Sequence, residues 1–128
     1  MATGFPAVTG DIFTAAAYNG LVNYTVQNNT ADLTAAITDQ YQVLEVMNKA
    51  TAIAFNIPTN ASVAFPIGTV ITILNVGAGL CTIKAVTSGT TTILSAGAVV
   101  AQPTLGQYKS AACIKTLTDT WVIVGAIA

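Results

Sequence analysis

The segment from residue 69 to residue 76 constrains the fold most, because it is apolar on both sides. Its sequence is Thr-Val-Ile-Thr-Ile-Leu-Asn-Val, so Val70 and Leu74 alternate with Ile71 and Ile73. Side chains of a strand point alternately to its two faces, and both faces of this strand therefore need a cover. One small sandwich covers only one face of each sheet. The second cover is then the N-terminal segment or a neighbouring subunit.

Turn signals divide the rest of the chain into short strands. Gly, Pro and Asn recur at intervals of roughly 8–12 residues, with β-branched stretches between them. The predicted strands span residues 41–48, 52–57, 69–76, 80–85, 92–94, 107–116 and 121–127. Gly77-Ala-Gly79 is expected to join two of them as a hairpin, and residues 118–120 to join the last pair. This pattern predicts an all-β fold, a small antiparallel β-sandwich or barrel.

Residues 1–34 contain little alternation of apolar and polar side chains. Thr9 or Asp11 is suited to cap a short helix that ends near Asn19-Gly20. We expect residues 1–34 to form an N-terminal docking arm with a short helix, and residues 35–128 to form the β module. The alternative is a helix that packs on its own domain. As an arm, the segment would bind a partner through Phe5, Ile12, Phe13, Leu21 and Val22.

Charged side chains make up only 7% of the chain, and it has no histidine and no arginine. An ordinary soluble domain carries about 25% charged residues. Nucleic-acid binding needs a basic stripe, which four scattered lysines do not provide. A surface with so little charge favours association, so we expect a subunit of an assembly. The predicted oligomer interface is one side of the 69–76 strand, either Val70, Leu74 and Val76 or Ile71 and Ile73.

The two cysteines are predicted to be free thiols. Cys81 alternates with Ile83 and is expected to face the core, whereas Cys113 is expected to share its face with Lys109 and Lys115. Cysteines on different kinds of face are poor disulfide partners. No apolar stretch is long enough for a spanning helix, and the N-terminus lacks the features of a signal peptide. Synthesis in a cytoplasm is therefore expected.

The parts needed for most enzymatic chemistry are missing. Without histidine there is no Ser-His or Cys-His pair, no imidazole base and no His/Cys metal site. Gly77-Ala-Gly79 lacks the lysine and the helix of a phosphate-binding loop. We predict no enzyme, with no catalytic residue, cofactor or metal. A glycosidase would need two acids to converge in a cleft, and the acids available are Asp11, Asp32, Asp39, Glu45 and Asp119.

The single tryptophan has two interpretations. Trp121 opens a terminal strand and is flanked by Val122 and Ile123, which is typical of a core anchor. Phe55 and Phe65 are expected in the same core. The alternative is that Trp121, or loops that carry tyrosines, stack against sugars.

Several stretches share their order and spacing with a known module. Residues 56–79 combine Pro-Thr-Asn-Ala-Ser-Val-Ala-Phe-Pro-Ile-Gly-Thr with an apolar strand and Gly-Ala-Gly. Residues 106–115 read Gly-Gln-Tyr-Lys-Ser-Ala-Ala-Cys-Ile-Lys, and residues 120–125 read Thr-Trp-Val-Ile-Val-Gly. Together with an opening strand at residues 38–46, they resemble a β-rich module of tailed-bacteriophage structural proteins. The resemblance covers about residues 35–128.

The resemblance implies a role in a virion. Such modules are similar to capsid decoration (cement) proteins, head fibres and tail-fibre domains, which are usually trimeric. We expect a homotrimeric capsid decoration protein on the surface of the phage head, bound to the major capsid protein and in contact with neither nucleic acid nor membrane. Its short length favours decoration over a fibre. The alternative is a short head- or tail-fibre module that binds host-surface glycans.

Overall fold

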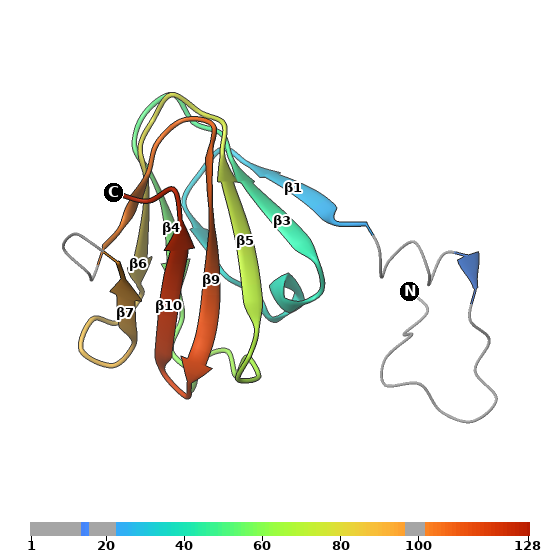
Figure 1. The fold of residues 1–128 in the computed structure, drawn as a ribbon, viewed down its shortest axis with the longest axis vertical. Helices are drawn as coiled ribbons and strands as arrows, with labels where there is room; N and C mark the ends of the chain where they lie inside the picture. The colour runs from blue at the N-terminus through green and yellow to red at the C-terminus, as the bar shows by residue number, and fades with distance from the viewer. Residues whose placement is uncertain (1–13, 16–22, 97–101) are drawn as a thin grey trace.

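The structure is a computed structural model, and it describes residues 14–15, 23–96 and 102–128. These residues form two β-sheets that enclose one hydrophobic core (Figure 1). The larger sheet has six strands in the order β1-β3-β5-β9-β10-β7, and the smaller sheet has four in the order β2-β4-β6-β8. The predicted all-β class is confirmed.

The described strands are short, and a 3-10 helix, η1 (Ile37–Gln40), precedes the third of them. Their bounds are β1 Thr25–Asn29, β2 Leu33–Thr34, β3 Val43–Met47, β4 Ile53–Ile57, β5 Val70–Asn75, β6 Cys81–Ala85, β7 Thr92–Ser95, β8 Thr104–Leu105, β9 Lys109–Leu117 and β10 Thr120–Gly125. Each strand predicted from the sequence lies within two residues of an observed one. The prediction omits β1, β2 and β8.

Consecutive strands from β1 to β9 alternate between the two sheets, so the chain winds as a flat coil. From β1 to β6 the turns return in the same direction, which makes β1, β3 and β5 parallel in one sheet and β2, β4 and β6 parallel in the other. Parallel neighbours need a crossover connection, and here a strand of the opposite sheet supplies it. Antiparallel pairs among the described strands are β5–β9, β9–β10 and β6–β8. The sandwich is therefore mixed rather than antiparallel throughout.

Gly77-Ala-Gly79 forms a corner between the two sheets instead of the predicted hairpin, because β5 and β6 lie in different sheets. The corner rests on the previous turn of the coil, where Gly79 N–H donates to Lys49 O at 2.9 Å. A Cβ atom on Gly79 would overlap the carbonyl oxygen of Thr51, and one on Gly77 would overlap the backbone of Lys49. Glycine is therefore required by close backbone contact at both positions.

A buried asparagine completes this corner. The Asn75 side chain is fully buried, and its amide nitrogen donates to Gly79 O at 2.9 Å and to Leu105 O at 2.8 Å. Its amide oxygen accepts from Gly77 N–H at 3.2 Å. The polar atoms of this side chain are thus paired, and it ties the corner to β8.

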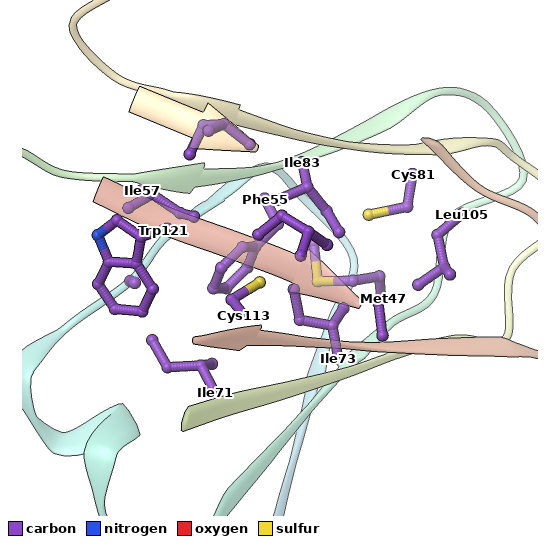
Figure 2. Packing of buried hydrophobic residues seen from close by; sticks show 14 of the residues in the cluster. Met47, Phe55, Ile57, Ile71, Ile73, Cys81, Ile83, Leu105, Cys113 and Trp121 are labelled. Carbon is purple, nitrogen blue, oxygen red and sulfur yellow. The ribbon is translucent and has the colours of Figure 1, made fainter. Parts of the chain in front are cut away.

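The aromatic residues predicted as core anchors lie inside the sandwich. Trp121 is only 1% exposed, and its ring meets Phe65 edge-on, with centroids 5.5 Å apart and ring planes at 89°. Phe55 is fully buried on β4. Figure 2 shows how side chains from both sheets interdigitate around Phe55 and Trp121. These side chains include Met47, Ile57, Ile71, Ile73, Ile83 and Leu105.

The β module begins earlier than residue 35. β1 and β2 lie within residues 1–34, the predicted docking arm, yet β1 pairs with β3 and β2 pairs with β4. Residues 25–29 and 33–34 are therefore part of the sandwich. β1 was missed because Thr-Val-Gln-Asn-Asn is a polar edge strand without alternation. The five apolar residues proposed as arm contacts lie outside the described residues.

Cys113 shares a face of β9 with Lys115, as expected, but that face points into the core instead of away from it. Ala111, Cys113 and Lys115 point into the core, whereas Ala112 and Ile114 point away from it. Cys113 therefore shares the core with Cys81, and both are buried free thiols. Burial raises the pKa of Cys81 to about 11 and raises the pKa of Cys113 further still. Both side chains act as small apolar groups at neutral pH.

Candidate interaction surface

The six-stranded sheet has a side that points away from the core, and we call its side chains the outer face. Strand alternation and register define its members. On β5, for example, Ile71 and Ile73 are fully buried, while Val70, the first residue of the strand, is 48% exposed. The outer face consists of Val26, Asn28, Leu44, Val46, Val70, Thr72, Leu74, Thr92, Leu94, Ser110, Ala112, Ile114, Val122 and Val124.

The outer face is aliphatic and uncharged. Nine of its fourteen residues are Val, Leu or Ile, and none of the fourteen carries a charge. Several remain open to solvent, with exposed fractions of 64% for Val26, 45% for Val124 and 43% for Leu94. A sheet whose second side faces water normally has polar residues there. An uncharged, aliphatic sheet surface is therefore the candidate interaction site of this protein.

The smaller sheet has the opposite character on its outward side. Its outward residues are small and mostly polar, and one is charged: Thr34, Ala54, Asn56, Thr82, Lys84 and Thr104. This composition is ordinary for a surface in contact with water. The two outward sides of the sandwich therefore differ, and the six-stranded sheet has the more apolar one.

Two ionisable side chains of the six-stranded sheet point inward. Lys115 is 2% exposed, and its ammonium group donates to Asn60 Oδ1 at 2.6 Å and to Phe65 O at 2.7 Å. It also lies 6.0 Å from the centroid of the Trp121 ring, within the range of a cation–π contact. Desolvation lowers the pKa of Lys115, and the nearby Asp119 charge opposes that shift.

Asp119 supports the same region from the turn between β9 and β10. Its Oδ1 accepts from Asn60 N–H at 2.8 Å and from Thr91 Oγ1 at 3.4 Å. Asn60 therefore bridges Lys115 and Asp119. These contacts are structural, because they tie the loop before β5 to the β9–β10 hairpin.

Glu45 on β3 is the other inward-pointing charge, and it is 1% exposed. Its Oε1 accepts from Asn29 Nδ2 at 3.4 Å, whereas its Oε2 has no hydrogen-bond donor within the described residues. Burial, with the neighbouring Asp39 as a second cause, raises the pKa of Glu45 to about 7.

The Asp39–Glu45 pair brings two acids together, as the glycosidase alternative requires. Both are buried, however, with Asp39 at 3% exposed. Asp39 Oδ2 also accepts from Ala36 N–H at 2.8 Å at the start of η1. Asp32 instead holds the backbone of β4 by accepting from Ala54 N–H at 2.9 Å, and Asp11 lies outside the described residues. The described acids therefore do not line an open cleft.

A shallow hollow of about 410 Å³ adjoins the outer face near η1. Gln42, at its rim, has a φ of 55° in the left-handed region. The lining residues are uncharged: Tyr24, Gln40, Gln42, Pro66, Ile67, Gly68, Thr69 and Val70. The hollow offers one aromatic ring and two amides, and it lies apart from the buried Trp121.

The structure separates the two predicted sets of interface residues. Ile71 and Ile73 are fully buried inside their own sandwich, so they cannot form an interface between subunits. Val70 and Leu74 belong to the outer face, and Val76 follows β5 as a half-buried residue. The contributions of β9, β10 and β7 were missed, because sequence alternation shows that a strand has two faces without showing which strands are neighbours.

Comparisons with protein-family models, curated proteins and solved structures found no match to this chain. In the parts of the chain that the structure describes, no helix is long and apolar enough to cross a membrane.

Proposed function

We propose that this chain is a structural subunit of a virion, a capsid decoration protein that binds the assembled phage head. It would be made in the host cytoplasm and added to the outside of the shell, where it bridges neighbouring copies of the major capsid protein. The chemistry of the proposal is surface burial, so it requires no catalytic group, cofactor or metal.

The observation that carries the proposal is the uncharged outer face, because it favours a subunit of an assembly over a free monomer. An apolar side on a six-stranded sheet is costly to expose, and association removes it from water at roughly 25 cal/mol per Å². The sequence resemblance to phage structural modules over about residues 35–128 supports a virion as the assembly.

Decoration would stabilise the shell by mass action. A ligand that binds only the assembled state lowers its free energy by RT ln(1 + [L]/Kd), which is about 2.7 kcal/mol per site at 100 times Kd. Many sites on one shell multiply this effect. The expected phenotype of a particle without the protein is therefore earlier release of DNA on heating.

The direct test is electron microscopy of the native particle, together with reconstitution. Purified protein added to undecorated heads is expected to bind saturably and to raise the temperature of DNA release. The matched variants are Thr72→Lys on the outer face and Thr82→Lys on the polar side of the other sheet. Absence of the protein from the head in the map, or a lack of binding to heads, would contradict the proposal.

The second candidate function is glycan binding by a short fibre module. Burial of Trp121 excludes this residue as an exposed sugar platform, but the hollow with Tyr24, Gln40 and Gln42 has groups suited to a neutral saccharide. A glycan array with the intact protein and with Tyr24→Ala tests it. Tyr24-dependent binding to the array would support the second candidate.

A further inference from the structure

We propose that the outer face is covered by further copies of this chain, so that the oligomer forms through the six-stranded sheets. The inference rests on the proposed function in one respect: both assume that the outer face is buried against another chain. It goes further by assigning this surface to self-association, which leaves contact with a shell to other parts of the molecule.

Charge is the first argument for a copy of this chain as the occupant. A surface that meets its own copy brings identical residues near one another, so any charge on it would meet a like charge under many arrangements. The fourteen outer-face residues carry none. A different partner would usually be selected by complementary charges, and this face has no charge with which to select one.

The register of the strands is the second argument. One row across the sheet runs Val26, Leu44, Thr72, Ala112 and Val124, with the small Thr72 and Ala112 at its centre. The next row along the strands is larger, with Val70, Ile114, Val122 and Leu94. A ridge of aliphatic side chains beside a row with two small residues at its centre gives two copies a way to interdigitate.

The size of the face sets the expected strength. Six strands at the usual spacing span about 24 Å, and about five residues along each strand span about 16 Å, giving a footprint of roughly 400 Å². This is smaller than the roughly 800 Å² per partner of a standard stable interface. We therefore expect a weak, reversible equilibrium between monomer and oligomer, with a dissociation constant of roughly tens to hundreds of micromolar.

The experiment is analytical ultracentrifugation of the full chain, without particles, from about 1 µM to about 1 mM, a range that brackets a dissociation constant of tens to hundreds of micromolar. The wild-type protein is expected to shift from monomer to oligomer. Thr72→Lys places a charge at the centre of the outer face and is expected to weaken association by roughly 100-fold or more. Thr82→Lys makes the same change on the polar side of the sandwich and should leave the dissociation constant within about twofold.

Circular dichroism and thermal melts of each variant separate lost association from lost folding. If Thr72→Lys does not fold, Val124→Lys at the rim of the same face takes its place. A wild-type protein that stays monomeric to the highest concentration overturns the inference, as does an equal loss of association in Thr82→Lys.

Failure of self-association can be distinguished from failure of the proposed function. Copies that associate in solution but do not bind heads would support self-association and contradict decoration. Wild-type protein that binds heads as a monomer, with Thr72→Lys unable to bind them, would support decoration and overturn self-association, because the face would then contact the shell.

Discussion

At the scale of single residues, the sandwich has ionisable side chains in its interior and aliphatic side chains on its surface, the reverse of the usual arrangement in a β protein. Glu45 and Lys115 lie in the interior, while Val26, Val70 and Val124 lie outside. Buried ionisable groups persist only when hydrogen bonds or a change of protonation compensate for the lost water. Lys115 has two short acceptors, and Glu45 has a raised pKa. The effect of Glu45 can be tested by unfolding at several pH values, and the effect of Lys115 by substitution.

Protein stability is expected to fall as the pH rises from about 4.5 to about 7, because of Glu45. Its pKa is about 7 in the folded protein and 4.5 as the ordinary value. The folded state therefore binds more protons than the unfolded state in this window, and raising the pH removes stability, by at most about 3 kcal/mol. Urea unfolding at several pH values measures the effect. Glu45→Gln should flatten the curve, and an unchanged slope in this variant would contradict the assignment.

Replacement of Lys115 by Met is expected to destabilise the fold by about 2–4 kcal/mol. The methionine fills a similar volume but leaves the oxygens of Asn60 and Phe65 without their donor in a buried site. Lys84→Met on the outward side of the other sheet is the matched control and should change stability by less than about 0.5 kcal/mol. Chemical denaturation compares the two. Equal effects would show that the buried hydrogen bonds contribute little.

At the scale of elements, the sequence predicted where most strands begin and end, but it did not predict which strands pair with one another. The strands at residues 53–57 and 70–75 follow from their alternation. Alternation gives a strand two faces but not its neighbours, so Gly77-Ala-Gly79 fitted a hairpin as well as a corner. The lysines of β9 suggested an outward face, because an isolated sequence does not show the acceptors that bury Lys115. The outer face was thus predictable only on β5, where both sides are apolar.

The corner at Gly79 is expected to tolerate no side chain. Gly79→Ala would place a Cβ atom against the Thr51 carbonyl, so the stacked turns must separate, at a cost of about 2–4 kcal/mol. Gly106→Ala is the control, because the nearest atom there is the flexible Lys109 side chain at 3.6 Å. Thermal unfolding of both proteins makes the comparison. A Gly79→Ala protein as stable as the control would show that the corner adapts.

At the scale of the whole molecule, the sandwich is asymmetric, with one apolar outward side and one mostly polar outward side. The low charge of the sequence predicts association, and the sheet order brings strands as distant as β1 and β7 onto the apolar surface that we propose for it. The predicted domain boundary at residue 34 would leave β1 outside the sandwich, whereas β1 contributes Val26 to that surface.

Deletion of residues 2–23 is expected to leave the thermal midpoint of the β module within a few degrees of the full chain, because the deletion ends before β1. Extending the deletion to residue 29 removes β1 and the Asn29 donor to Glu45, and it should lower the midpoint clearly. Under the docking-arm hypothesis the shorter deletion also abolishes particle binding. Normal decoration by the shorter truncation would refute that hypothesis.

The alternation of strands between two layers also governs how quickly the chain reaches its native state. Apart from the β9–β10 hairpin, the ladder pairs of the described strands join partners that are not consecutive in sequence. Chains dominated by such non-local pairing fold in roughly milliseconds to seconds, because loop closure comes before any gain from contact. Stopped-flow fluorescence of Trp121 is expected to report a slow refolding phase, and a microsecond relaxation would contradict this. Slow maturation leaves nascent copies with unpaired edges for longer, which favours their capture by chaperones in a crowded cell.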